Sequence, residues 1–182
     1  MADDGFGHPR LAAIYDPLDP DRSDLDAYLR MAEEFEARQD LDIGCGAGVF
    51  ALLLADRGID VIGIDPAQPS IDVARAKPGS ERVRWICGDA TALPPLQVDL
   101  ATTTANVAQE IADPVSRPLV TFRWTHVFGA DGQVLTSDST LRFRERDEVE
   151  TDLVAHGYEL QGVRDAPDRP GNEFVFLARR PG

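Results

Sequence analysis

The 182-residue sequence is poor in cysteine, in basic side chains and in long apolar runs. Its two cysteines, Cys45 and Cys87, lack CxxC spacing, so neither a disulfide framework nor a zinc site is expected. No stretch approaches the roughly 18 consecutive apolar residues that suggest a membrane-spanning helix. The first residues, MADDGFGHPR, carry acids where a secretory signal has basic residues followed by an apolar core. We therefore expect a cytoplasmic protein with no membrane segment.

Acidic side chains far outnumber basic ones, with 32 Asp and Glu against 18 Lys and Arg and a formal net charge of -14. Nucleic-acid phosphates are bound by clustered Lys and Arg, so a nucleic-acid partner is not expected. The apolar fraction of 43% suits a globular chain. A chain of this length buries roughly 70% of its unfolded surface, which favours one domain over residues 1–182.

The first part of the chain alternates between short apolar strands and amphipathic helices. The patterns predict strands over 39–44, 59–65, 82–88 and 98–106, and helices over 23–38, 49–58 and 70–77. Ser23 and Ser70 are placed as N-caps of the first and last of these helices. Strands rich in Val and Ile that alternate with helices indicate right-handed crossovers, a parallel sheet and helices on both faces.

Beyond Asn106 the rhythm changes to antiparallel pairing. Residues 121–128 and 133–143 flank a glycine-containing turn, which predicts a hairpin. A helix over 146–157 and closing strands over 158–165 and 173–180 follow. The predicted fold class is therefore α/β, with a Rossmann-like, doubly wound and mainly parallel sheet plus an antiparallel C-terminal hairpin.

The segment LDIGCGAG, residues 41–48, joins the first strand to its helix through glycines spaced as GxGxG. Such a turn lets backbone approach a ligand, because glycine has no Cβ and tolerates positive φ. A dinucleotide turn reads GxGxxG, which would place its third glycine at position 49, where this chain has Val49. Asp42, two residues before Gly44, suits a cationic or amine-bearing ligand and disfavours a diphosphate.

Further acids follow the next two strands. Asp65 ends the second strand and is placed to accept hydrogen bonds from two ribose hydroxyls, whereas it would repel a 2′-phosphate. Pro66 beside it offers a flat apolar face to an adenine. Asp89, just past the third strand, is suited to accept from an adenine amino group while the Ala90 amide donates to the ring.

In this order LDIGCGAG, VIGIDP, GDATALP and VDLATTTAN resemble the class I S-adenosylmethionine-dependent methyltransferase superfamily, particularly its small bacterial members. The resemblance covers residues 37–110. It implies that the glycine turn wraps the methionine part of S-adenosylmethionine, that the acid after strand two holds the ribose, and that the acid after strand three holds the adenine. The candidate cofactor-binding residues are Tyr15, Asp42, Gly44, Cys45, Gly46, Asp65, Pro66, Asp89, Ala90 and Asn106.

The resemblance also implies a division of the chain and an acceptor side. Residues 1–36 would form an N-terminal helical lid, 37–110 the cofactor-binding half, and 111–182 the hairpin and a C-terminal αββ half. Tyr15 would close over the methionine end. Methyl transfer is an in-line displacement, so holding a small-molecule acceptor close and aligned supplies most of the catalysis. Asn106 is the candidate positioning residue.

His126 is a weaker candidate for a role at the acceptor pocket. It alternates with Trp124 and Phe128 on one face of the predicted hairpin strand, and an unperturbed histidine titrates near neutrality.

The pattern departs from the superfamily after the fourth strand. A fifth parallel strand normally follows, whereas here the chain runs almost directly into the hairpin. Either QVLTSDST replaces that strand, or the sheet has an unpaired edge, which makes a homodimer plausible. Asp40 is a second departure, since a charge in a central strand must be solvated, paired or protonated.

Two other classes of function stay open at this point. A non-catalytic cofactor-binding or dimerisation module, derived from such an enzyme, would explain the shortened second half. An NAD-dependent oxidoreductase is the more distant alternative.

Overall fold

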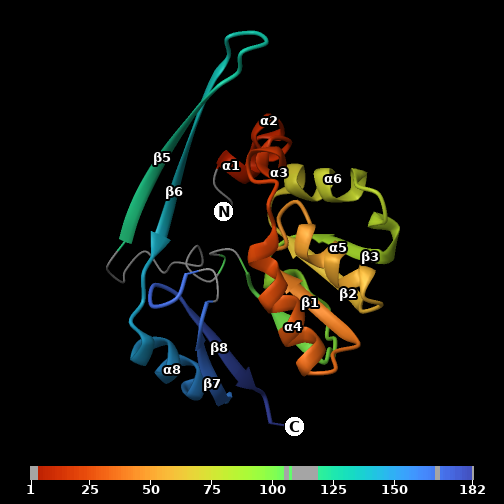
Figure 1. Ribbon diagram of the computed structural model, residues 1–182, viewed down its shortest axis with the longest axis vertical. Helices are drawn as coiled ribbons and strands as arrows, with labels where there is room; N and C mark the ends of the chain where they lie inside the picture. The colour runs from red at the N-terminus through yellow and green to blue at the C-terminus, as the bar shows by residue number, and fades with distance from the viewer. Residues whose placement is uncertain (1–3, 105–106, 108–118, 167–168, 182) are drawn as a thin grey trace.

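A computed structural model of the chain describes residues 4–104, 107, 119–166 and 169–181. Its centre is a four-stranded sheet in the order β3-β2-β1-β4 (Figure 1). Every pairing in this sheet is parallel. The strands are β1 (Gln39–Ile43), β2 (Asp60–Asp65), β3 (Val83–Cys87) and β4 (Leu100–Thr102).

Helices connect these strands and precede them. The crossovers contain α5 (Val49–Asp56) and α6 (Gln68–Ala76), and α4 (Asp26–Glu34) comes just before β1. Short 3-10 turns lie at η1 (Ser23–Leu25), η2 (Ser80–Arg82) and η3 (Ala90–Ala92). At the N-terminus three single turns follow one another: α1 (Asp4–Gly7), α2 (Pro9–Ala12) and α3 (Tyr15–Leu18). No described helix is long and apolar enough to cross a membrane.

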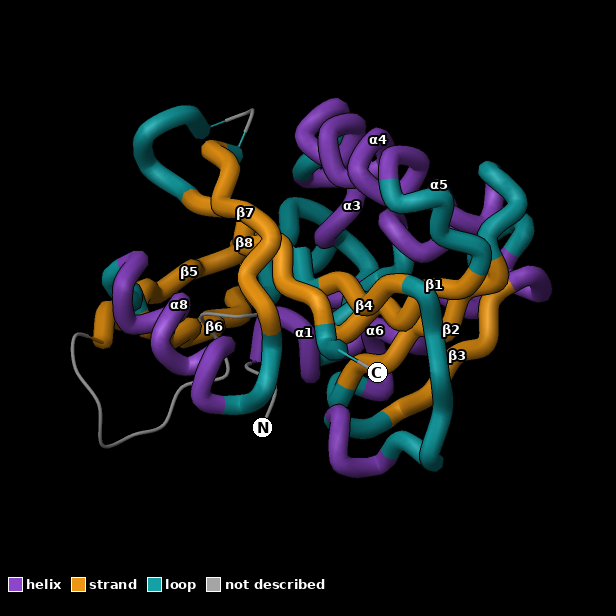
Figure 2. The backbone as a smooth tube through the Cα atoms, turned by 90° about the horizontal axis from the view of Figure 1, so that it is seen from below, coloured by secondary structure: helices purple, strands orange, loops and turns teal. Residues whose placement is uncertain are grey.

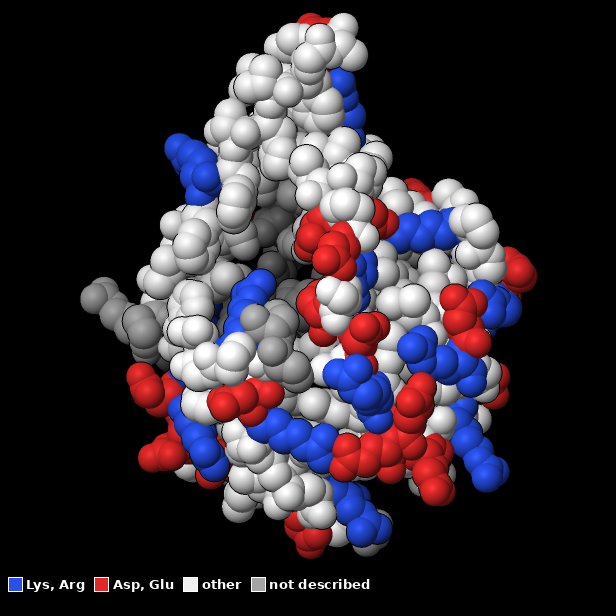
Figure 3. All heavy atoms as spheres, in the orientation of Figure 1, with Lys and Arg blue, Asp and Glu red and all other residues white. Residues whose placement is uncertain are grey.

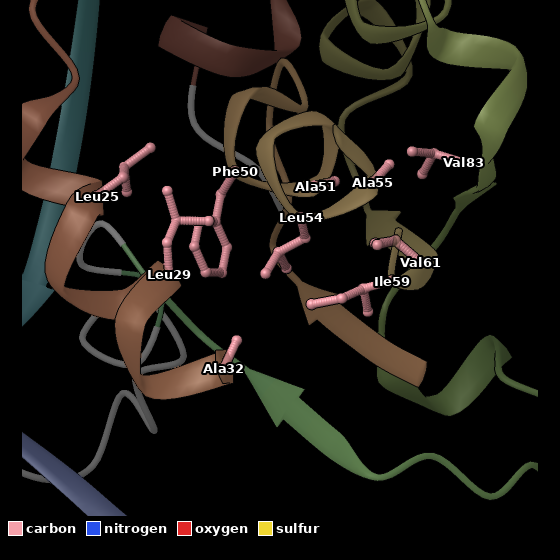
Figure 4. Packing of buried hydrophobic residues seen from close by; sticks show 10 residues of the cluster. All are labelled: Leu25, Leu29, Ala32, Phe50, Ala51, Leu54, Ala55, Ile59, Val61 and Val83. Atoms are coloured by element: carbon pink, nitrogen blue, oxygen red, sulfur yellow. The ribbon is translucent and has the colours of Figure 1, made fainter. Parts of the chain in front are cut away.

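The main core lies between α4, α5 and one face of the central sheet (Figure 2). Leu29 of α4 and Leu54 of α5 are 1% and 0% exposed, and Figure 4 shows Leu29 pointing toward Phe50. The apolar positions of α4 recur at helical spacing, so one side of the helix is buried while its charged side faces water. Burial of several such side chains, each contributing about 1.5 to 3 kcal/mol, anchors the sheet that carries the site.

The second half forms two separate antiparallel pairs, β5 (Leu119–Val127) with β6 (Val134–Arg142), and β7 (Glu159–Asp165) with β8 (Phe174–Arg179). The helix α8 (Arg146–Ala155) joins them. The long β5–β6 hairpin runs alongside the N-terminal helices (Figure 1), and Arg10 of α2 pairs with Asp131 at its tip. Arg164 of β7 forms a bidentate pair with Glu34 of α4, at 2.6 and 2.8 Å, which links the C-terminal pair to the core helices.

The parallel sheet and the antiparallel hairpin confirm the predicted fold class. Of the two alternatives for the missing fifth strand, the structure contradicts the first, because Val134–Arg142 pairs with β5 and not with β4. Among the described residues the central sheet therefore ends at β4.

The predicted helix caps at Ser23 and Ser70 are wrong. The Asp21 carboxylate accepts the Ser23 N–H at 3.0 Å, so the chain first turns as the 3-10 helix η1, and α4 begins at Asp26. Helix α6 begins two residues before Ser70, with a proline in its first turn, where the missing N–H costs nothing. The buried Ser70 hydroxyl instead donates to the Phe6 carbonyl at 3.2 Å.

Asp40 is fully buried in β1, on the face that also carries Val61 and Leu100 of the core. The Thr102 hydroxyl donates to its Oδ2 at 3.1 Å, while its Oδ1 has no hydrogen-bond partner among the described residues. Burial raises the pKa of Asp40 to about 7, and the Thr102 hydrogen bond opposes the shift. Of the three alternatives for this acid, the structure combines pairing with partial protonation.

A raised folded-state pKa gives stability that is complete at low pH and is lost as the pH rises toward about 7. Asp40→Asn keeps an acceptor for Thr102 and removes the buried charge. We expect it to raise the unfolding free energy at pH 8 by about 2 kcal/mol and to flatten its pH dependence between pH 5 and 8. Urea denaturation across this range measures both, and an unchanged pH profile would contradict the buried-charge assignment.

Candidate functional site

The glycine turn after β1 is anchored on the end of β2. The Gly44 and Cys45 N–H groups both donate to the Ile64 carbonyl, at 2.8 and 3.1 Å. Gly44, Gly46 and Gly48 have φ of 74°, 53° and 79°, a region that side-chain-bearing residues rarely adopt. The three glycines are therefore required by the path of the backbone.

The space around the three glycines differs. A Cβ at Gly44 would lie 2.5 Å from Val107, and one at Gly48 would lie 2.4 Å from the Trp85 ring. A Cβ at Gly46 would meet nothing within 4 Å. The outer glycines thus fit against protein, whereas Gly46 faces open space that a ligand can use.

Asp65 at the end of β2 holds the turn through its side chain. Its Oδ2 accepts the Gly46 N–H at 2.9 Å and its Oδ1 accepts the Ala67 N–H at 2.8 Å. The residue is 7% exposed, and burial raises its pKa against the opposing effect of these two hydrogen bonds. Each carboxylate oxygen keeps a second lone pair, so Asp65 remains able to accept from ligand hydroxyls.

Asp42 lies in β1 beside this turn and is 1% exposed. Neither of its carboxylate oxygens has a hydrogen-bond partner among the described residues. Burial raises the pKa of Asp42 well above its ordinary value, the nearby charges of Asp40 and Asp65 raise it further, and the backbone N–H of Ala51 opposes the shift. A buried acid whose oxygens lack well-formed hydrogen bonds is costly, and a cationic ligand beside it would relieve that cost.

Asp89 and Pro66 complete the row at the carboxyl edge of the sheet. Asp89 follows β3, caps η3 and accepts the Thr91 N–H at 2.9 Å. The Thr91 side chain and N–H hold the pKa of Asp89 below its usual range, so this exposed acid is ionised. Pro66 and Ala90 are also exposed. Acids thus stand at the ends of β1, β2 and β3, the edge where open α/β sheets bind ligands.

The Cys45 side chain is structural. It is buried, burial raises the pKa of its thiol, and its sulfur packs against β2, where a Cβ on Gly63 would come within 3.0 Å. The Cys45 backbone is held within the turn, since its N–H donates to the Ile64 carbonyl and its carbonyl accepts the Gly48 N–H at 2.8 Å. The described residues contain no group of three or more His, Cys, Asp or Glu that could hold a metal ion.

Tyr15 belongs to α3, which is tied to the glycine turn by a contact that the sequence did not reveal. Lys77 forms an ion pair with Asp16, next to Tyr15, and also donates to the Ala47 carbonyl at 2.6 Å. Tyr15 is 41% exposed, and its ring centroid lies 5.5 Å from that of Phe6. The only available signal was that Lys77 is the single lysine of the chain.

Of the two candidates for the acceptor side, Asn106 and His126, the structure describes only His126. Asn106 lies outside the described residues. His126 lies in β5 opposite Leu135, and Trp124 lies opposite Ser137, so both side chains share one face of the hairpin. His126 is half-buried, and Figure 3 shows a hollow between this hairpin and the N-terminal helices.

Strand order, glycine turn and strand-end acids together define an α/β fold of the class I methyltransferase type. Residues 41–121 match the family described as a methyltransferase domain. The match covers 81 of the 182 residues and assigns this segment to the methyltransferase-domain family.

The relatives share short segments with this chain. A biotin biosynthesis bifunctional protein, BioHC, of Cellvibrio japonicus is 48% identical over 54 residues, which are 30% of this chain and 11% of BioHC. A ubiquinone biosynthesis O-methyltransferase of Leptothrix cholodnii is 37% identical over 82 residues, 42% of this chain and 34% of the enzyme. The chain thus spans about a third of these relatives or less.

Solved structures match over almost the whole chain. An S-adenosylmethionine-dependent methyltransferase of Clostridium acetobutylicum has a TM-score of 0.75 at 16% identity and covers 95% of this chain and 98% of its own. The S-adenosylmethionine-bound amino pentose methyltransferase CalS10 of Micromonospora echinaspora has a TM-score of 0.66 at 16% identity, with 89% and 93% covered. At this identity the likeness confirms the fold.

Gly48 and Gly58 form a matched pair for testing the turn. Both have positive φ, 79° and 80°, but only a Cβ at Gly48 meets protein. The Trp85 ring there is held by its Nε1–H bond to the Ser80 carbonyl at 3.0 Å. We expect Gly58→Ala to cost about 1 kcal/mol of unfolding free energy and Gly48→Ala about 1 to 3 kcal/mol more. Equal losses in chemical denaturation would contradict the close fit at Gly48.

Proposed function

We propose that this protein binds S-adenosylmethionine and transfers its methyl group to a small-molecule acceptor by in-line displacement. The observation that carries the proposal is the pairing of Asp65 with the open glycine of the turn. The Asp65 carboxylate accepts the Gly46 N–H at 2.9 Å. A Cβ at Gly46 would meet no protein atom within 4 Å. The methyltransferase domain match over residues 41–121 supports the same reading.

The residues present fit this cofactor. The orphaned oxygens of Asp42 would receive the methionine ammonium group, which supplies the missing donors. Asp65 would accept from the ribose hydroxyls, and the exposed Pro66 would lie against the adenine. Asp89 and the Ala90 amide would hold the adenine edge, while Gly44, Cys45 and Gly46 contribute backbone to the methionine part.

When bound, S-adenosylmethionine supplies an electrophilic methyl group on a sulfonium. The protein's part is to orient the acceptor in line with that group and to exclude water, which can replace a dedicated base because effective molarities of about 10⁵ M are attainable. Asn106 stays our candidate for positioning the acceptor. His126 stays a weaker candidate for accepting a proton. Tyr15 is proposed to close over the methionine end.

The acceptor is proposed to be a small molecule. The relatives reported above carry names from biotin, ubiquinone and amino pentose chemistry. The hollow beside the hairpin has acidic side chains on the side of the N-terminal helices and basic ones at its lower edge (Figure 3).

A homodimer is a separate proposal. It is supported by β4 and β5, which each leave one edge unpaired within the described residues. Sedimentation velocity tests it, and a monomer at all concentrations would exclude it.

Gly46→Ala tests cofactor binding, with Gly58→Ala as the matched control. Both glycines have positive φ and open surroundings, so both variants should lose about 1 kcal/mol of stability. Only Gly46→Ala places a methyl group in the ligand's space. We expect it to weaken S-adenosylhomocysteine binding by about 100-fold or more, and Gly58→Ala to leave binding unchanged. Isothermal titration calorimetry measures both, and an equal effect would place the ligand elsewhere.

The non-catalytic alternative makes a different forecast. A cofactor-binding or dimerisation module would bind S-adenosylhomocysteine yet never form product. Tritium transfer from labelled S-adenosylmethionine to a panel of phenols, amines and amino sugars decides between them. Any methylated product excludes the alternative, whereas tight binding without product supports it. Saturable NADH fluorescence enhancement would instead favour the oxidoreductase.

A further inference from the structure

The single lysine of the chain occupies a distinctive place. One Lys stands among 18 Lys and Arg residues, and that lysine, Lys77, directly follows α6. Its Nζ donates to the Ala47 carbonyl in the glycine turn at 2.6 Å and pairs with the Asp16 carboxylate. One ammonium group therefore joins the cofactor turn to the N-terminal segment.

The N-terminal segment, residues 4–18, is also held by the hairpin, through Arg10 near its middle. We call this segment the strap. Arg10 pairs with Asp131 at 2.6 and 3.2 Å, and its guanidinium lies 3.8 Å from the centre of the Phe128 ring. Leu11 and Ala12 are 3% and 2% exposed, so the middle of the strap is packed. The strap thus connects the hairpin tip to the glycine turn.

The ammonium group of Lys77 is suited to bond two partners that lie on different sides of it. An ammonium is a compact charge with three donors that can reach a carbonyl and a carboxylate on different sides. The Lys77 side chain is 22% exposed and that of Asp16 is 26% exposed, so the pair is partly shielded from solvent.

We propose that Lys77 is a positioning residue that latches the strap onto the glycine turn and thereby couples strap closure to cofactor occupancy. This inference rests on the proposed function. The Ala47 carbonyl belongs to the same turn as the Gly46 N–H that Asp65 holds, so Lys77 and Asp65 fix two peptide groups of the turn that are separated by one other. Release of the strap opens the cofactor site on the side where Tyr15 lies. Closure and cofactor binding then favour one another by the same factor.

The first arm of the test compares Lys77→Met with Arg82→Met. Arg82 is a matched control because it also joins a backbone carbonyl, that of Ala55 at 3.3 Å, to a carboxylate, that of Asp56 at 2.5 Å, away from the strap. We expect Lys77→Met to weaken S-adenosylhomocysteine binding about tenfold, the effect of one lost charge-assisted hydrogen bond. Arg82→Met should leave binding unchanged, and Lys77→Arg, which keeps the charge for Asp16, should restore most of it.

The second arm uses the wild-type chain and needs no variant. A brief pulse of sulfo-N-hydroxysuccinimidyl acetate acylates amines before the amine of the ligand is consumed. After proteolysis, mass spectrometry gives the rate at Lys77 relative to that at the N-terminal amine, which corrects for reagent taken up by the ligand. Saturating S-adenosylhomocysteine should slow Lys77 acylation about tenfold, by reciprocity with the first arm. In Asp16→Asn, acylation should be faster and less sensitive to the ligand.

The outcomes distinguish failure of the Lys77 latch from failure of the proposed cofactor binding. If wild type fails to bind S-adenosylhomocysteine, the proposed function and the inference both fail. If wild type binds, but Lys77→Met binds equally well and ligand leaves Lys77 acylation unchanged, only the latch fails. If Lys77→Met does not fold, the labelling of wild type and of Asp16→Asn still decides.

Discussion

The Asp65 carboxylate is the interaction on which the site depends. It receives the Gly46 N–H and the Ala67 N–H, at 2.9 and 2.8 Å, and so joins the turn after β1 to the start of α6. The Asp65 carbonyl also accepts the Gly88 N–H at 2.9 Å, which brings the loop after β3 to the same place. Segments from three strand ends therefore converge on one residue. A charge-assisted pair of hydrogen bonds compensates the burial of this acid, and the same geometry leaves lone pairs for a ligand.

Strand β1 contains two more buried acids, although a central strand of a parallel sheet is ordinarily apolar. Asp40 and Asp42 face the core side of the sheet, and oxygens of both lack hydrogen-bond partners among the described residues. Such groups reduce stability, and they are retained where a site needs them. Asp42 has a use in the proposed cation site. Among the described residues Asp40 has a hydrogen-bond partner only in Thr102, so its burial lowers the stability of the fold.

Local patterns sufficed to predict the elements that lie next to one another in sequence. Strand-end acids, the glycine turn and the hairpin followed from periodicity and turn chemistry, and the structure places Asp42, Asp65 and Asp89 at adjacent strand ends. Contacts between distant segments left no such pattern. Ser70 resembled a cap but is bonded to Phe6, and Lys77 gave no motif although it reaches Asp16 and Ala47. Asn106 remains a prediction, because it lies outside the described residues.

The central claim is that the buried Asp42 meets a cationic cofactor. Burial raises the pKa of Asp42 and a cationic ligand lowers it, so binding releases protons and affinity rises with pH wherever the free acid is still protonated. Calorimetric titration with S-adenosylhomocysteine between pH 6 and 8, in buffers of different ionisation heats, measures that release. We expect tighter binding and proton release toward pH 8, both of which Asp42→Asn abolishes. Binding that is independent of pH and unaffected by Asp42→Asn would contradict the cation site.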